Sequence, residues 1–266
     1  MKYTINKTDI NLDINQEIIG DDTVDYCHRD LVQASQNWYS KGYCVLKVPE
    51  DFIQSIRKNT LHYLNGVNKK LSLHELPKIE RYHQFIRSNE HHLEYIREVG
   101  KHIKPDELGL DQTVLAKIVK KACGIEESRG INCKDLCDIR LFRPFLSSKM
   151  DNNPLHRDTW LPVLNNCVNI YIPVAGSNEN SSLALIPESH LWERNKVSRT
   201  KDNAKIKGIQ YGLPSVAEIQ TEYEVIRPHM ANDEILIFSS NIIHGGSVNL
   251  NKEITRCSIE IRFWEN

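Results

Sequence analysis

The chain has 266 residues, of which 40% are hydrophobic and 26% charged, and its formal net charge at pH 7 is −1. This composition is typical of a globular protein. The near-zero charge argues against a protein that binds nucleic acid through bulk positive charge. No apolar run approaches the roughly 18 residues of a membrane-spanning helix, and residues 1–20 lack the apolar stretch of a secretory signal. We therefore expect a small-molecule partner and neither nucleic acid nor a membrane.

Seven cysteines occur without a regular framework, which favours reduced thiols and a cytoplasmic protein. Cys133 and Cys137 could bind a metal, but no second Cys or His pair with zinc spacing follows them. Free thiols are therefore the favoured interpretation of this pair.

The first half of the sequence, residues 1–135, has mainly helical periodicity. Apolar spacing predicts helices over residues 28–41, from Pro49 onward and over residues 111–122, with a short strand at 43–47. The polar region 69–105 is expected to be helical in part. It carries five histidines: His74, His83, His91, His92 and His102. Because no carboxylate or cysteine pattern accompanies them, a solvated helix face is favoured over a metal site.

From about residue 136 the period changes to the alternation of strands. The expected strands are 138–143, 155–160, 167–174, 183–187, 223–227, 234–239 and 254–263. Short strands after a helical half predict an α+β fold with a mainly β core, namely a double-stranded β-helix (jelly roll) with N-terminal helices packed on one sheet. We expect a single domain over residues 1–266. Residues 192–221 carry no strand pattern and predict a structureless, lid-like insertion.

Two places in the sequence carry a His-x-Asp spacing: His28 with Asp30, and His156 with Asp158. Alternate residues of a strand point to the same side, so His156 and Asp158 are expected to project together. With His244 as a third ligand they would form the 2-His-1-carboxylate set of non-haem Fe(II) oxygenases. Asp30 precedes a helical pattern and is better explained as a helix-start residue. At the second place a chance match is an equal alternative, because the spacing alone is weak.

Four segments in a fixed order resemble the phytanoyl-CoA hydroxylase-like family of Fe(II)/2-oxoglutarate dioxygenases. They are residues 39–46, residues 171–174 with 182–190, residues 232–238, and the His-Gly-Gly-Ser of residues 244–247. The resemblance implies that His156, Asp158 and His244 are the catalytic ligands of one Fe(II), with 2-oxoglutarate and dioxygen as co-substrates. The chain departs from the family at three positions: Glu188 and Asn232 replace the usual glycine, and Tyr171 replaces a frequent tryptophan.

The last predicted strand has one polar and one apolar face. The polar face carries Arg256, Ser258, Glu260 and Arg262. In the family, an arginine at about the offset of Arg256 from the distal histidine pairs with the far carboxylate of 2-oxoglutarate. Guanidinium donates two parallel hydrogen bonds to a carboxylate, and Ser258 adds a third donor. We expect Tyr171 in the same pocket. Arg262 is the second candidate anchor, and an ion pair with Glu260 or Glu253 is the alternative role of Arg256.

By resemblance, the reaction is oxidation of a substrate coupled to conversion of 2-oxoglutarate to succinate and carbon dioxide. Related halogenases have a small residue in place of the carboxylate ligand, so Asp158 favours hydroxylation, or a desaturation or cyclisation. The alternative from another class is a catalytically silent jelly-roll binding or sensor module. A kinase loop is excluded because the required Asn is Val163. Arg256 and Ser258 argue against a metal oxygenase that uses no 2-oxoglutarate.

A basic segment predicts the charge of the substrate. Between Trp192 and Gly208 lie six basic and two acidic residues: Arg194, Lys196, Arg199, Lys201, Lys205 and Lys207 against Glu193 and Asp202. The segment would close over an anionic substrate as a lid, and a solvated loop is the equal alternative. Arg140 and Arg143 are three apart on a strand, so one of them should face the barrel interior. Arg140, Arg143 and Arg194 are therefore the candidate substrate-binding residues.

Overall fold

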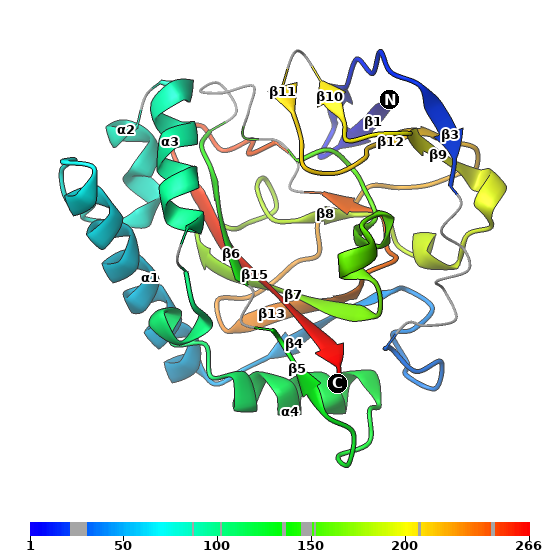
Figure 1. Cartoon of the computed structure of the whole chain (residues 1–266), viewed down its shortest axis with the longest axis horizontal. Helices are drawn as coiled ribbons and strands as arrows, with labels where there is room; N and C mark the ends of the chain where they lie inside the picture. The colour runs from blue at the N-terminus through cyan, green and yellow to red at the C-terminus, as the bar shows by residue number, and fades with distance from the viewer. Residues whose placement is uncertain are drawn as a thin grey trace.

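The computed structural model describes the chain except residues 22–30, 87, 102, 135–136, 145–150, 152, 207–208 and 246–247, and except the side chain of Arg194. The first His-x-Asp match and His102 lie outside the described residues. Figure 1 shows helices on one side of a central sheet and a group of short strands, which includes the N-terminus, on the other. Among the described residues, no helix combines the length and the apolar character that crossing a membrane requires.

An antiparallel sheet of six strands runs through the middle of the molecule (Figure 1). Its order is β4 (Tyr43–Lys47), β13 (Glu234–Ser239), β7 (Cys167–Ala175) and β15 (Arg256–Glu265), and the far edge of β15 pairs with β6 (Cys137–Phe142) and β5 (Ile131–Asn132). The predicted strands 43–47 and 234–239 are confirmed to the residue. Strand β15 is the longest of the six and borders three others, so its two faces decide what lies on each side of the sheet.

One face of this sheet packs on the helices. The helices are α1 (Glu50–Lys70), α2 (Tyr82–Phe85), α3 (Asn89–Gly100) and α4 (Gln112–Cys123). The apolar residues Ile259 and Ile261 of β15 share one buried cluster with Ile56 of α1 and Leu115 of α4. Asp111 begins α4 by accepting hydrogen bonds from the first backbone N–H groups of the helix. The architecture is therefore mixed α/β with a mainly sheet core and helices on one face.

A shorter layer of strands lies on the other face of the sheet. Strand β14 (His244–Gly245) pairs with β8 (Ala184–Leu185), and single bridges extend the ladder from His244 to His156 and from Leu185 to Ile226. Buried apolar side chains of both layers form one cluster: Tyr171, Leu183, Leu185, Leu236, Phe238 and Ile242. The space between the two layers therefore has an apolar wall.

Three predicted strands are shorter than expected. Segments 155–160 and 223–227 pair only at His156 and Ile226, and segment 183–187 is reduced to β8. After the bridge at His156 the chain turns, and Asp158–Trp160 is a 3-10 turn, η5. At the start of this turn, Asp158 N donates to the carbonyl oxygen of Ser240, the residue directly after β13. This bond replaces further pairing between residues 157–160 and the strand of His244. Further 3-10 turns are η2 (Ile79–Arg81), η3 (Pro105–Leu108), η6 (Pro162–Leu164), η7 (Ser189–Leu191) and η8 (Arg194–Lys196).

The predicted helix over residues 28–41 is wrong where the structure describes it, because residues 31–41 form successive turns. The end of α4 provides the reason. Gln33 N donates to Cys123 O, and the Trp38 indole donates to Ala122 O at 2.8 Å. These bonds to another element replace the helical ladder, while Trp38 keeps the buried position that its spacing indicated.

Residues 192–221 are not structureless. Strand β9 (Val197–Thr200) pairs on one side with β3 (Ile18–Gly20) and on the other with β12 (Val216–Ile219). The remaining short strands form two hairpins: β10 (Lys205–Ile206) with β11 (Ile209–Gln210), and β1 (Lys2–Ile5) with β2 (Thr8–Asn11). The N-terminal layer thus includes strands as well as helices. Sequence reasoning missed this sheet because β9 pairs with β3, a segment about 180 residues away.

Candidate active site

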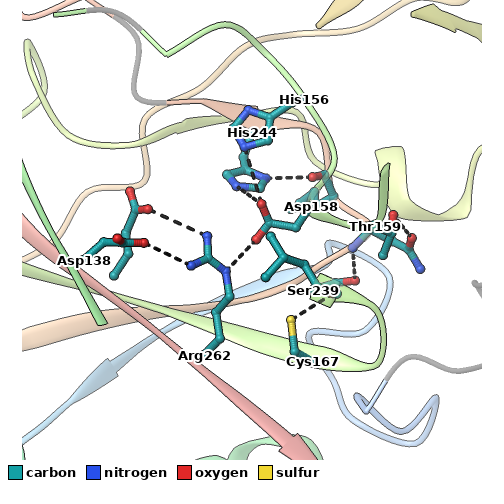
Figure 2. Close-up of polar contacts among 12 residues, drawn as sticks. Asp138, His156, Asp158, Thr159, Cys167, Ser239, His244 and Arg262 are labelled. Atoms are coloured by element: carbon teal, nitrogen blue, oxygen red, sulfur yellow. Dashed lines mark hydrogen bonds and ion pairs between the residues drawn. The ribbon is translucent and has the colours of Figure 1, made fainter. Parts of the chain in front are cut away.

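His156, Asp158 and His244 converge on one point between the two layers (Figure 2). Nε2 of His156 lies 3.5 Å and Nε2 of His244 lies 3.8 Å from Oδ1 of Asp158. All three side chains are buried. Within the described part of the chain, this is the one group of three His, Cys, Asp or Glu side chains whose ligand atoms lie within 4.8 Å of one another.

Backbone pairing brings the two histidines together. His156 N donates to His244 O and His244 N donates to His156 O, both at 2.9 Å. The two imidazole centroids are therefore 4.4 Å apart. A Cβ atom at Gly245 would lie 3.0 Å from the carbonyl oxygens of Asn153 and Pro154, so the residue after His244 has to be small.

Both imidazoles turn Nε2 toward the carboxylate. Nδ1 of His156 lies 2.7 Å from Pro154 O, and Nδ1 of His244 lies 3.0 Å from Ile242 O. A carbonyl oxygen only accepts, so each Nδ1 donates and each Nε2 keeps its lone pair. Burial lowers the pKa of His244 to about 4, which favours the neutral ring. Two imidazoles that direct Nε2 toward one carboxylate form a ligand set that fits a divalent iron ion.

Arg262 holds the other oxygen of Asp158. Its Nε donates to Oδ2 at 3.0 Å, which leaves Oδ1 facing the imidazoles (Figure 2). Burial by itself would raise the pKa of Asp158, but the charge of the Arg262 guanidinium holds it well below its usual range. Arg262 also lies 3.4 Å from Asp138 and 3.9 Å from Glu260. Arg262, the second candidate for the 2-oxoglutarate anchor, is thus bound to carboxylates of the protein itself. Its contact with Asp158 orients that side chain.

The two arginines of β6 have different surroundings. Arg140 pairs with Ser258 in the strand register, so it lies on the inner face, where its Nε is 3.1 Å from Glu260. Arg143 is buried against Asp151, which accepts from its Nε at 2.9 Å and its Nη2 at 3.0 Å. Its Nη1 donates to Ser88 O beside α3. Arg143 is therefore held by groups of the protein itself, and contact of Arg140 or Arg143 with a substrate stays a prediction.

The two residues predicted to anchor the co-substrate, Arg256 and Ser258, lie together at the start of β15. Arg256 is 0% exposed, its Nη1 donates to Ser258 Oγ at 2.7 Å, and its guanidinium lies 3.9 Å from the centroid of Phe142. The ring centroid of Tyr171 lies 5.8 Å from the same guanidinium, and the Tyr171 hydroxyl is hydrogen-bonded to Ser177. The sequence placed Arg256, Ser258 and Tyr171 in one pocket, and in the structure they lie together.

Arg227 is a second guanidinium near this pocket, and sequence reasoning missed it. Its two Nη atoms donate to Ser182 O and Val248 O. Burial and the nearby charge of Arg256 lower the pKa of Arg227 to about 10. In the described structure, Arg227 Nε and Ser182 Oγ are buried without a hydrogen-bond partner. Two neighbouring positive charges and two buried polar atoms without a hydrogen-bond partner fit a carboxylate such as that of 2-oxoglutarate.

The basic segment 192–208 is partly bound to its own sheet. Arg199 Nη1 donates to the carbonyls of Thr200 and Lys201, and its guanidinium lies 5.7 Å from the ring centroid of Trp160. Lys201 forms an ion pair with Glu17 at 3.0 Å. The predicted substrate contact Arg194 lies outside the described side chains. The segment thus contributes β9, the central strand of a three-stranded sheet, and strand β10, and contact of its basic side chains with a substrate stays a prediction.

Comparison with known families identifies the class of protein. The family model described as "Phytanoyl-CoA dioxygenase (PhyH)" matches residues 38–257, and the chain belongs to this family. It is an enzyme of the Fe(II)/2-oxoglutarate-dependent oxygenase superfamily, with Fe(II) as its metal and 2-oxoglutarate and dioxygen as co-substrates. No curated protein sequence matches the chain.

Several solved structures resemble the chain at low sequence identity. AviO1 from Streptomyces viridochromogenes Tue57 has 13% identity and a TM-score of 0.47, over 92% of this chain and 96% of that one. EvdO2 from Micromonospora carbonacea var. aurantiaca has 11% identity and a TM-score of 0.48, over 86% and 88%. The non-heme alpha ketoglutarate dependent carbocyclase SnoK from nogalamycin biosynthesis has 12% identity and a TM-score of 0.46, over 85% and 80%.

Proposed function

We propose that the chain hydroxylates a small metabolite, expected to be anionic, and that His156, Asp158 and His244 are its Fe(II) ligands. The convergence of their ligand atoms carries the proposal, together with the carbonyl bonds that turn both Nε2 atoms inward. Three ligands on one side of an iron ion leave positions for the co-substrates. Two buried imidazoles that direct Nε2 toward a buried carboxylate have no evident structural use without a metal.

The same proposal includes the jelly roll. The inner layer has the order His156, β14, β8 and Ile226, and it faces β6, β15, β7 and β13 in the large sheet. Eight antiparallel segments in two facing ladders are what a double-stranded β-helix requires. The apolar clusters on both sides of the large sheet support one domain over residues 1–266.

In this site, each group has a separate task. Bound iron supplies the activation of dioxygen that is coupled to decarboxylation of 2-oxoglutarate. Arg256 and Ser258 bind the distal carboxylate of 2-oxoglutarate, and Arg227 adds positive charge beside them. Arg262 keeps one oxygen of Asp158 available to the metal. The apolar wall at Phe238, whose ring lies 4.8 Å from that of His244, excludes water next to the metal.

Asp158 favours hydroxylation over halogenation, because it occupies the coordination site that a halogenase leaves open. Desaturation or cyclisation by the same centre is the second candidate. The mass of the product decides between them, because hydroxylation adds one oxygen atom whereas desaturation or cyclisation removes two hydrogens. A metabolite screen for 2-oxoglutarate turnover, with anionic compounds first, supplies the substrate.

The first experiment measures succinate release from 2-oxoglutarate, Fe(II) and dioxygen. We expect release from the wild type and none from His156→Ala or His244→Ala, because each variant lacks one metal ligand. His91→Ala, at an exposed position of α3, is the matched control and should retain activity, as should His28→Ala. A wild type that binds Fe(II) but releases no succinate with any candidate substrate would support the silent binding module instead.

A further inference from the structure

Asn169 is a buried side chain with unused hydrogen-bonding groups. It lies on β7, near the start of the strand, and is 3% exposed. Neither its Nδ2 nor its Oδ1 has a hydrogen-bond partner among the described residues. A carboxamide carries two donors and one acceptor, and native proteins rarely bury such groups unpaired because desolvation is then uncompensated. A buried side chain in this state indicates that its hydrogen-bond partner is a bound ligand.

Other buried asparagines of the same molecule show the usual behaviour. Asn68 on α1 donates to His74 O at 2.6 Å. Asn249 donates to Phe142 O and Ile254 O, and its Oδ1 accepts from the backbone of Asn251. Both side chains have structural partners. Asn169 therefore differs from the structural asparagines of its own chain.

The strand register places Asn169 next to two residues that touch the metal-binding group. Asn169 is paired with Arg262 on β15 and with Phe238 on β13. Directly paired residues project from the same face, with Cβ atoms about 5 Å apart. Arg262 binds Asp158, and the ring of Phe238 contacts that of His244. The carboxamide thus lies on the inner face, beside the contacts of two of the three proposed ligands.

The polar side chains next to Asn169 already have partners within the protein, so the carboxamide is available to a ligand with acceptor oxygens. Tyr171, two residues further along the inner face, already has Ser177 as its hydrogen-bond partner. Arg262 is bound by carboxylates of the protein. An amide N–H donor beside a metal centre suits the carboxylate of a 2-oxo acid, which brings acceptor oxygens to the metal.

We propose that Asn169 is a binding residue for the metal-bound end of 2-oxoglutarate, with its Nδ2 donating to the carboxylate next to the keto group. This inference rests on the proposed function, because it requires Fe(II) at His156, Asp158 and His244. It assigns the two ends of the co-substrate to different strands, with Arg256 on β15 at the distal end and Asn169 on β7 at the metal end.

The test combines stability and binding, and needs no turnover. Asn169→Leu has nearly the same shape and no polar groups. We expect the metal-free variant to unfold at the same temperature as wild type or higher, because an unpaired polar group is removed. Under anaerobic conditions with Fe(II), calorimetry should show a Kd for 2-oxoglutarate raised about tenfold to a hundredfold, since a hydrogen bond to a charged group is lost. The Fe(II) affinity without co-substrate should change less than threefold.

The matched control is Asn68→Leu, which removes a satisfied buried carboxamide far from the site in sequence. It should unfold at a lower temperature and bind 2-oxoglutarate like wild type. An Asn169→Leu protein that is destabilised like this control and binds 2-oxoglutarate normally would overturn the inference. If the leucine variant does not fold, Asn169→Ala adds no bulk and should show the same loss of affinity. A wild type that binds no 2-oxoglutarate overturns the proposed function as well, so the two failures are distinguishable.

Discussion

The inner face of β15 carries two arginines, and the two have different partners. Arg262 lies 3.0 Å from Asp158 and 3.4 Å from Asp138, both carboxylates. Arg256 contacts the hydroxyl of Ser258 and the faces of aromatic rings. A guanidinium held by the protein's own carboxylates has its charge balanced. A buried guanidinium beside a hydroxyl, with Arg227 close by, is suited to bind an incoming anion. We therefore propose different tasks for the two arginines of this strand.

The largest expected effect is that of Arg256→Leu. It should raise KM for 2-oxoglutarate by a factor that corresponds to about 2–5 kcal/mol, because a buried carboxylate loses its charged partner. Fe(II) affinity should stay near that of wild type. Steady-state kinetics and an anaerobic Fe(II) titration measure the two quantities. An unchanged KM, with a loss in Arg262→Leu instead, would mean that the two arginines have been assigned the wrong way round.

Arg262→Leu should act on the metal. Loss of a residue that orients a metal ligand typically lowers metal affinity about 10–100-fold, and Asp158 would lose the partner that leaves Oδ1 free. We expect weaker Fe(II) binding with a smaller change in the KM for 2-oxoglutarate at saturating iron. Arg262→Lys keeps the charge and should recover part of the affinity. Equal Fe(II) binding by wild type and Arg262→Leu would refute a positioning role.

Arg227→Gln should have a smaller effect on the co-substrate than Arg256→Leu. Both Nη atoms of Arg227 already donate to backbone carbonyls, so its contribution comes from its charge and Nε. We expect KM for 2-oxoglutarate to rise roughly threefold to tenfold, as for one weak charge interaction. The double variant Arg227→Gln/Arg256→Leu tests coupling: purely additive free energies would show that the two side chains do not bind the same carboxylate.

The smallest expected effect concerns salt. If the basic segment recruits an anionic substrate, kcat/KM should fall as ionic strength rises, because charges beyond about 8–10 Å are screened. Neutralising Arg194, Lys196 and Arg199 together should remove most of this dependence. The effect is limited because Arg199 is bound to its own sheet. An uncharged substrate, or turnover indifferent to salt, contradicts the lid hypothesis.

Sequence reasoning located what depends on local pattern and missed what depends on register. The alternation of residues in β15 predicted one polar and one apolar face of this strand. The family motifs indicated that His156, Asp158 and His244 lie close together, as they do in the structure. The family glycine at position 188 has a physical reason as well, since Glu188 has a φ of +64°, in the left-handed region that favours glycine.

The missed residues are those whose neighbours come from other strands. Arg227 reaches the anchor only through the bridge of Ile226 to Leu185, and Asn169 meets Arg262 only through the register of β7 on β15. His92 was expected on a solvated face but is buried, with Nε2 3.1 Å from Asp151. One-dimensional periodicity contains no information about such cross-strand partners.

The reciprocal backbone pair between His156 and His244 has a consequence for how the protein folds. It joins segments far apart in the chain, so it forms only after the chain between them has closed as a long loop, at an entropic cost. An unfolded chain does not hold the proposed ligands together, so Fe(II) binds the folded state selectively and stabilises it by mass action. Iron supply would then set the lifetime of this protein in a cell as well as its activity, because the iron-free form opens more often to proteases.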